Sequence, residues 1–240
     1  DRWAAAGWER GALGYPVGDT TCGLRDGGCF QHFQGGSVYW SPGTGARVLS
    51  VEIRDRWGAA GWENGALGFP VSDVGSLKDG GRFVHFQGGS IYWSPATGAR
   101  IVSGVVRDRW AAAGWENGPL GFPVSDVTAL ADGGAFAHFQ GGSVYWSSGT
   151  GARVLLAPVR DAWLAAGGDA GDLGMPVADA ASTPDGLAQY GRFAGGAVYL
   201  HAALGGHVVP GAVVEAWDAA GGIDGVLGYP TSDAVPTADG

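Results

Sequence analysis

Alternating apolar and polar side chains in residues 82–94 predict a β-hairpin. Residues 82–87 read Arg-Phe-Val-His-Phe-Gln, and residues 90–94 read Ser-Ile-Tyr-Trp-Ser. The Gly88-Gly89 pair between them is typical of a two-residue hairpin turn. After a second turn, the sequence predicts a third strand over about residues 100–106.

Pairing across this hairpin assigns the side chains to two faces of the sheet. With the turn at the Gly-Gly pair, His85 lies opposite Tyr92 and Val84 lies opposite Trp93. The face of Val84 is apolar and is expected to form core. The face of His85 is mixed, with His, Tyr, Gln and Ser around one Phe. A register slip of one residue would exchange the two faces.

A short helix and a tight turn precede the hairpin. Residues 55–60 read Asp-Arg-Trp-Gly-Ala-Ala, which indicates about two helical turns, capped by Asp55 and ended at Gly61. The Leu-Gly-Phe-Pro motif of residues 67–70 predicts a tight turn, because Pro fixes φ and Gly accepts a positive φ. Asp73 follows this motif and is expected to form a side-chain-to-backbone turn.

This unit recurs along the chain, which indicates a repeat array. The Leu-Gly-X-Pro motif starts at five positions, with spacings of 54, 53, 53 and 54 residues: Leu13, Leu67, Leu120, Leu173 and Leu227. The helical tryptophan recurs with the motif, at Trp3, Trp57, Trp110, Trp163 and Trp217. The repeats are residues 1–54, 55–107, 108–160, 161–214 and a partial 215–240, and we expect them to form a single domain.

The predicted fold class is mainly β with short helices. Each unit combines a helix and turn with a β-hairpin, and we expect the units to form a propeller-like ring with pseudo-fivefold symmetry. An open, twisted repeat array is the alternative, because the fifth unit stops where its hairpin should begin.

Composition and charge narrow the classes of partner. The chain has 47 Gly and 12 Pro among its 240 residues, but its 11 Trp argue against disorder. The net charge is −9 and Lys78 is the single lysine, so nucleic acid is not an expected partner. The sequence has no run of about 20 apolar residues, so we expect no membrane span.

Two cysteines, Cys22 and Cys29, lie seven positions apart. A local disulfide is the favoured interpretation and suits an extracellular setting, with two free thiols as the alternative. Two cysteine ligands make a poor zinc site, and each of the first three repeats supplies one histidine to an equivalent position. We therefore predict no metal and no cofactor.

The tryptophans fall into three columns of equivalent positions. The helical column is expected to anchor the helix in the core. The column that ends the second hairpin strand fits either core or an exposed platform: Trp40, Trp93 and Trp146. The third column lies in a glycine-flanked turn beside a glutamate: Trp8, Trp62 and Trp115, next to Glu9, Glu63 and Glu116. Aromatic rings stack on the apolar faces of sugars and carboxylates bond sugar hydroxyls, so this column fits ligand contact or packing between repeats.

A polar column shares the mixed face of the hairpins in the first three repeats. It comprises His32, His85, His138, Tyr39, Tyr92, Tyr145, Gln34, Gln87 and Gln140. These side chains fit structural hydrogen bonding or recognition of a sugar or another polyol. The fourth repeat has Arg192 in place of the histidine, which indicates fewer equivalent sites than repeats.

The sequence resembles the LGFP repeat family over essentially its whole length. The resemblance rests on the Leu-Gly-Phe-Pro motif with Ser72-Asp73, the Asp-Gly-Gly turn of residues 79–81, the Gly-Gly hairpin and Thr97-Gly98-Ala99. The family usually has a second Gly after the Gly that ends the helix, as at Gly168 and Gly222. The first three repeats depart from this pattern, because tryptophan takes that position.

The resemblance implies a cell-wall module of secreted actinobacterial proteins. Such repeats are attached to mycolyltransferases and peptidoglycan amidases, so an attached catalytic domain is an expected partner. The implied function is non-catalytic binding of wall polysaccharide, either arabinogalactan or peptidoglycan, through the third tryptophan column with its glutamates and the polar column. A protein-interaction or structural scaffold is the alternative. A glycan hydrolase is less favoured, because the sequence has no G-x-S-x-G or His-Glu-x-x-His motif and most carboxylates recur at equivalent positions.

Overall fold

The computed structural model describes residues 2–234. The first residue of the first repeat, Asp1, and the end of the partial fifth repeat, residues 235–240, lie outside the described residues. The chain divides into two compact units. Unit 1 comprises residues 1–108 and 122–127, and unit 2 comprises residues 109–121 and 128–240.

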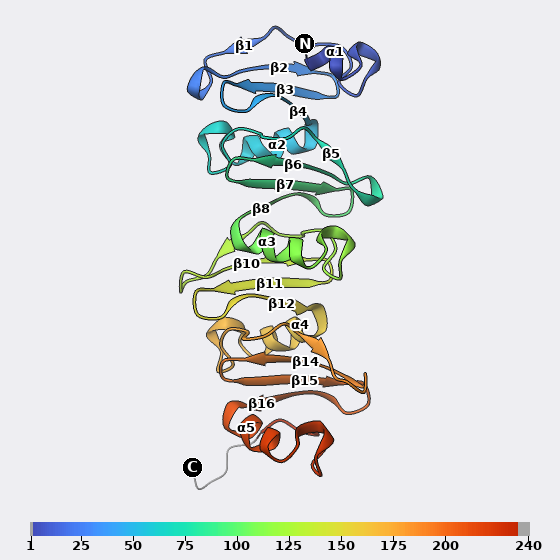
Figure 1. Cartoon of the computed structure of the whole chain (residues 1–240), viewed down its shortest axis with the longest axis vertical. Coiled ribbons are helices and arrows are strands. Elements are labelled where there is room, and N and C mark those ends of the chain that lie inside the picture. The colour runs from blue at the N-terminus through green and yellow to red at the C-terminus, as the bar shows by residue number, and fades with distance from the viewer. Residues whose placement is uncertain (1, 235–240) are drawn as a thin grey trace. The chain divides into compact units, whose positions relative to one another are not determined.

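Each of the five repeats contains an α-helix and a one-turn 3₁₀ helix, and the first four also contain a small antiparallel sheet, which Figure 1 shows in sequence. The α-helices are α1 (Arg2–Ala5), α2 (Val51–Ala59), α3 (Gly104–Ala112), α4 (Ala157–Ala165) and α5 (Gly211–Ala219). The 3₁₀ helices that follow them are η1 (Trp8–Arg10), η3 (Trp62–Asn64), η5 (Trp115–Asn117), η6 (Gly168–Ala170) and η7 (Gly222–Asp224). Two further 3₁₀ turns are η2 (Arg25–Gly27) and η4 (Lys78–Gly80).

Four repeats each form a four-stranded antiparallel sheet whose strand order follows the sequence. The first two sheets are β1 (Thr21–Cys22), β2 (Cys29–Phe33), β3 (Gly36–Ser41), β4 (Gly45–Ser50), and β5 (Gly75–Ser76), β6 (Arg82–Phe86), β7 (Gly89–Ser94), β8 (Gly98–Val102). The other two are β9 (Thr128–Ala129), β10 (Ala135–Phe139), β11 (Gly142–Ser147), β12 (Gly151–Leu156), and β13 (Ala181–Ser182), β14 (Ala188–Phe193), β15 (Gly196–His201), β16 (Gly205–Pro210). The prediction of a mainly β fold with short helices is confirmed. Over residues 2–234 no sheet closes into a barrel, and the propeller-like ring stays a prediction.

The hairpin register differs from the predicted one, although the two faces are as predicted. The turn is at residues 87–88, so Phe86 pairs with Gly89 and His85 pairs with Ser90 rather than with Tyr92. Moving the turn by one residue moves each cross-strand partner by two, which keeps every side chain on its face. Gly89 pairs inside the ladder, where a side chain at this position would meet the carbonyl of Val102 and the side chain of Leu67.

The helix of the second repeat begins four residues earlier than predicted. α2 starts at Val51, so Asp55 lies inside the helix and is not its cap. The third strand, predicted to reach residue 106, ends at Val102, because the apolar residues after it belong to the first turn of α3. Ile53 and Trp57, one helical turn apart, are both fully buried on one face of α2. Only the end of the helix was placed correctly, by Gly61 in the left-handed conformation with φ of 92°.

In unit 1, α2 packs against both the first and the second sheet. Tyr39 from β3 meets the Trp57 ring edge-on with a centroid distance of 4.7 Å, while Val84 and Ile91 of the second sheet join the same core. In unit 2, Tyr145 makes the same edge-on contact with Trp163. The mixed face of the hairpin is therefore covered largely by the helix of the next repeat, and its tyrosines are buried.

The helical tryptophans also fasten the Leu-Gly-X-Pro turn. In every repeat the indole N–H donates to the carbonyl of the motif glycine at 3.0–3.1 Å, eleven residues later. The rings of Trp57, Trp110 and Trp163 are fully buried. The prediction that this column anchors the helix in the core is confirmed, and the hydrogen bond explains why the anchor is tryptophan rather than another large apolar residue.

Aspartates after the motif join successive repeats within each unit. Asp73 Oδ1 accepts the Val48 N–H of the preceding repeat at 2.9 Å, and Arg2 pairs with the same carboxylate. Asp126 repeats this arrangement with Ile101 and Arg56. The expected role in a local turn was therefore incomplete, because these carboxylates bind the backbone of the previous sheet.

Candidate functional site

A cavity of about 300 Å³ lies in unit 1, where η3 of the second repeat meets the hairpin of the first. It is lined by Leu24, Phe30, His32, Tyr39, Trp62, Glu63 and Asn64. Four of the residues singled out from the sequence, namely His32, Tyr39, Trp62 and Glu63, thus come together in one place. The volume is at the lower end of the range typical of small-molecule sites, which is about 300–1,000 Å³.

Trp62 forms the aromatic wall of this cavity and is 38% exposed. Its ring meets Trp57 edge-on at 5.3 Å and lies nearly parallel to Tyr39, at 6.2 Å and an interplanar angle of 26°. The backbone of Trp62 has φ of 55°, a left-handed conformation that bulky residues rarely adopt. The ring also passes over Gly58, where a Cβ atom would come within 2.5 Å of it.

Glu63 brings a carboxylate to the cavity although the residue is only 5% exposed. Its Oε1 accepts a hydrogen bond from Asn64 Nδ2 at 2.9 Å and one from the Arg25 N–H at 3.4 Å. Within residues 2–234, no side chain or backbone group donates to its other oxygen, Oε2. That oxygen is an acceptor that a ligand hydroxyl can use.

His32 is held by the strand opposite it. Its Nδ1 lies 2.7 Å from Ser37 Oγ, which also accepts a hydrogen bond from Arg54 Nη1 at 3.3 Å. We assign the serine hydroxyl as the donor to Nδ1, and in this tautomer the proton of the neutral ring is on Nε2. Burial and the nearby Arg54 charge lower the pKa of His32, so Nε2–H is a donor at neutral pH.

Tyr39 supplies a ring that carries a hydroxyl group. Burial raises the pKa of its phenol to about 12, so the group stays protonated and able to donate. Its ring stacks on Phe30 at a centroid distance of 5.4 Å and an interplanar angle of 19°. The cavity thus offers an aromatic wall, donors from His32 and Tyr39, and an acceptor from Glu63.

The lowered histidine pKa values predict a pH dependence of stability. Burial and a nearby arginine lower the pKa of His32, His85 and His138. The unfolded chain therefore takes up these protons first as the pH falls below about 6.5. We expect the free energy of unfolding in urea to be lower at pH 5.5 than at pH 7.5, at constant ionic strength. A triple His→Gln variant should show a smaller difference, and an equal difference would contradict the assignment.

The other predicted ligand residues have different surroundings. His85 and His138 each contact a serine at 2.6–2.7 Å, as His32 does, and Tyr92 and Tyr145 are buried. Glu116 is buried and accepts a hydrogen bond from Asn117 at 2.8 Å, as Glu63 does from its neighbour. Trp115 is partly buried, whereas Trp8 in the first repeat is exposed.

A second cavity, of about 480 Å³, occupies the corresponding place between the fourth and fifth repeats, inside unit 2. Tyr190, Arg192 and Tyr199 line it from the sheet, and Asp218 and Gly222 line it from α5 and η7. The sequence showed Arg192 as a departure from the histidine of the first three repeats and Gly222 as the usual residue of the family at its position. It did not show that Arg192 and Gly222 lie at one site, because they belong to different repeats.

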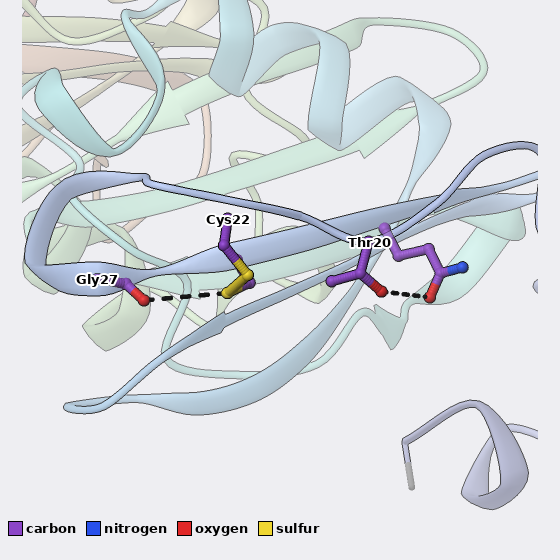
Figure 2. The surroundings of a disulfide bond; sticks show 5 residues. Thr20, Cys22 and Gly27 are labelled. Atoms are coloured by element: carbon purple, nitrogen blue, oxygen red, sulfur yellow. Dashed lines mark hydrogen bonds between the residues drawn. A yellow bond between two sulfur atoms is a disulfide. The ribbon is translucent and has the colours of Figure 1, made fainter.

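Cys22 and Cys29 form a disulfide across the β1–β2 pair, as Figure 2 shows. Thr20 Oγ1 donates to Gln31 beside it at 3.1 Å. Cys29 stands where the second repeat has Arg82, whose guanidinium covers Trp93 at 5.5 Å. The counterpart of Trp93 in the first repeat is Trp40, which is 41% exposed.

Two further features are absent from the described part of the chain, residues 2–234. No helix there is long and apolar enough to cross a membrane. No group of three or more His, Cys, Asp or Glu side chains within residues 2–234 is arranged to hold a metal ion.

A comparison with models of known families shows which family the chain belongs to. The family model described as "LGFP repeat" matches four consecutive segments, residues 13–65, 67–118, 120–171 and 173–225. The chain belongs to the LGFP repeat family. None of the curated proteins compared with this LGFP repeat chain matches it.

Two solved structures are similar to parts of the LGFP repeat chain. A streptogramin B lyase is 11% identical with a TM-score of 0.16, and the match covers 81% of this chain and 54% of the lyase. The extracellular domain of the one-component system BT4673 from B. thetaiotaomicron is 15% identical with a TM-score of 0.18, covering 78% of this chain and 20% of that domain. TM-scores this low do not establish a shared fold. The LGFP chain spans about half the length of the first structure and a fifth of the second.

The motif that names the LGFP repeat has a structural role here. Gln87 Oε1 accepts the Phe69 N–H at 2.9 Å, and Gln34 holds Tyr15 in the same way at 3.0 Å. Gly68 has φ of 65°, and a Cβ there would approach Gln87 Oε1 to 2.4 Å. A Cβ at Gly121 would approach Gln140 Oε1 to 2.7 Å. The glutamines expected to contact a ligand thus lie against the motif turn, outside the cavity of unit 1.

Proposed function

We propose that the protein is a non-catalytic glycan-binding module that attaches a secreted protein to the cell wall. The observation that carries this proposal is the cavity of unit 1, which joins the exposed face of Trp62 to polar groups of His32, Tyr39 and Glu63. Membership in the LGFP repeat family, as established above, is compatible with a repeat module of this kind. Wall arabinogalactan and peptidoglycan are the proposed ligands.

The chemistry of this cavity matches a sugar. A pyranose or furanose ring presents a C–H face, which packs on an indole, and an edge of hydroxyl groups, which both donate and accept hydrogen bonds. Glu63 and His32 both line the cavity, so Oε2 of the carboxylate can accept, and Nε2 of the ring, in the assigned tautomer, can donate. Buried polar groups that have no partner cost free energy, so a hydroxyl-bearing ligand that pairs with them is favoured.

The backbone at Trp62 supports a role for the side chain itself. Non-glycine residues with positive φ cost about 1–3 kcal/mol and gather at functional sites. Trp8, Trp62 and Trp115 all have φ of 54–55°, whereas Gly168 and Gly222 occupy the same position without this cost. Three repeats keep tryptophan at this position despite the cost, so we infer that the indole side chain has a role that glycine cannot fill.

The proposal of a non-catalytic role rests on the number of carboxylates. Glycosidases generally use two, an acid and a base or nucleophile, on either side of the scissile bond. Glu63 is the single carboxylate that lines the cavity of unit 1 among the described residues. Repeated weak sites along an array gain affinity for a polymer by avidity, which suits attachment to a wall.

Replacing Trp62 with alanine tests this function. We expect Trp62→Ala to weaken retention on purified arabinogalactan or peptidoglycan at least about tenfold, because the sugar loses its stacking surface. Glu63→Gln should weaken it less, since the amide keeps one acceptor. Sedimentation of the protein with the insoluble polysaccharide measures the bound fraction.

Trp40→Ala is the matched control for this experiment. Trp40 is an exposed tryptophan of the same unit and does not line the cavity, so its removal should leave retention unchanged. Failure of the parent protein to bind either polysaccharide would overturn the proposed function. Release of reducing sugar by the parent would instead indicate a hydrolase.

A scaffold function is the second candidate, favoured by apolar side chains on the first repeat. Tyr15 and Val17 are more than half exposed, while Phe69, the counterpart of Tyr15, is buried. Exposed apolar patches mark protein interfaces. Capture of an attached or separate protein domain that depends on Tyr15, without binding to either glycan, is the result that would favour this function.

A further inference from the structure

The cavity of unit 2 is built from the same positions as that of unit 1 but with different chemistry. Gly222 takes the position of Trp62, so the aromatic wall is missing and the cavity grows to about 480 Å³. Arg192 takes the position of His32, and Tyr190 that of Phe30. Each replacement adds polar character or space.

A charged pair forms the polar wall of this cavity. Arg192 donates from Nη1 and Nη2 to the two carboxylate oxygens of Asp218 at 2.8 and 2.9 Å, and from Nη2 to the Tyr199 hydroxyl at 3.2 Å. This geometry uses only some of the five guanidinium N–H groups, and the Asp218 carboxylate is 45% exposed. Donors and acceptors therefore lie side by side on this wall.

Aromatic rings form the second wall. Tyr190 and Tyr199 stack at a centroid distance of 5.4 Å and an interplanar angle of 12°, and Trp217 meets Tyr199 edge-on at 5.0 Å. Tyr190 is partly exposed where it lines the cavity. The exposed part of the Tyr190 ring can take the C–H face of a sugar, the role proposed for Trp62 in unit 1.

The net charge of the residues that line the cavity disfavours acidic ligands. The charge of Arg192 is offset by Asp218, and that of Asp179 by Arg109. Asp224 then adds a carboxylate at the rim, and no lysine or histidine lines the cavity among the described residues. A ligand that carries a carboxylate or phosphate would meet net negative charge here.

We propose that the cavity of unit 2 is a second sugar site that takes an uncharged sugar residue, with the Arg192–Asp218 pair bound to two adjacent hydroxyls and the sugar face on Tyr190. This site rests on the proposed glycan-binding function and adds its preference for neutral over acidic sugars. The cavity of unit 1, with its tryptophan wall, is the smaller of the two.

A single substitution can close this site without disturbing the backbone. Gly222 has φ of 57°, and tryptophan occupies the same position with φ of 54–55° in three other repeats. Gly222→Trp should therefore keep the backbone conformation and place an indole over the cavity, where it displaces the side chain of Asp218, the counterpart of Gly58. Gly168→Trp is the matched control, because Gly168 has the same backbone conformation, φ of 63°, and does not line this cavity.

The experiment is isothermal titration calorimetry of the full chain with two probes. One is a neutral oligosaccharide mixture released from arabinogalactan, and the other is an oligogalacturonate of similar length. We expect Gly222→Trp to lose one binding site per chain for the neutral probe, and Gly168→Trp to keep it. Asp218→Asn should weaken the same site at least tenfold, because it removes a charge-assisted acceptor. The acidic probe should bind at least tenfold more weakly than the neutral one.

The possible failures are distinguishable. If the parent binds the neutral probe, and Gly222→Trp and Asp218→Asn bind it with unchanged stoichiometry and affinity, the site in unit 2 is wrong while the proposed function stands. Equal binding of the acidic probe overturns the preference for neutral sugars. A parent that binds no glycan overturns both proposals. Circular dichroism and the thermal midpoint check that Gly222→Trp is folded, and Asp218→Asn tests the site if it is not.

Discussion

Replacing Trp57 with alanine is expected to lower the free energy of unfolding by about 3–5 kcal/mol, the cost typical of removing a buried tryptophan. The ring is fully buried between the first and second sheets and contacts Tyr39, Trp62 and Phe86. The substitution also leaves the Gly68 carbonyl without the indole donor. Urea denaturation followed by tryptophan fluorescence and circular dichroism measures the change.

Trp57→Phe separates the two contributions. Phenylalanine keeps most of the apolar contact but cannot donate to Gly68, so we expect a loss between that of alanine and zero. Trp40→Ala, which removes an exposed ring of the same unit, should change stability by less than about 1 kcal/mol. A Trp57→Ala protein as stable as the parent would show that the helix is held by other contacts.

Gly88→Ala is expected to lower the free energy of unfolding by about 3 kcal/mol, at the upper end of the range for overpacking, because there is no space for the new methyl group. A Cβ atom at Gly88 would lie 2.0 Å from the backbone oxygen of Ala66. Because a backbone oxygen cannot move away by changing rotamer as a side chain can, the hairpin turn must move away from the Leu-Gly-Phe-Pro motif. The hydrogen bond from the Gly88 N–H to the Leu67 carbonyl, 2.9 Å long, would be strained as well.

Gly43→Ala is the control for this substitution. Gly43 also lies in a turn, but it has no neighbour within 4 Å of an added Cβ and its φ is not in the left-handed region. We expect the free energy of unfolding of the Gly43→Ala variant to stay within about 0.5 kcal/mol of that of the parent. Equal losses for Gly43→Ala and Gly88→Ala, measured by urea denaturation, would mean that turn flexibility rather than close packing decides the outcome.

Much of the fold could be predicted from the sequence because each repeat repeats the same signals. Gly61 marks the end of α2, and the period-2 alternation marks β6 and β7. The start of α2 could not be placed in this way, because Ile53 fits both the end of a strand and the first turn of a helix. The helical conformation buries Ile53 against two sheets, and this burial depends on contacts with the next repeat.

The candidate site was predictable residue by residue but not as a whole. Trp62 and Glu63 belong to one repeat, whereas His32 and Tyr39 belong to the repeat before it. A sequence pattern within one repeat cannot show which equivalent positions of two repeats meet. Gln87 was grouped with the histidines because the predicted strand placed it on their face, but Gln87 lies in the shifted turn and contacts the Leu-Gly-Phe-Pro motif instead.

The left-handed backbone position shared by Trp62 and Gly222 has a consequence for how such arrays evolve. The tryptophan codon UGG and the glycine codon GGG differ in one base, and the main chain at this position is already suited to both residues. One transversion is then enough to add or remove an aromatic wall in a single repeat, while the fold of its neighbours is unchanged. Gene duplication followed by such point changes would give one chain a graded set of pockets.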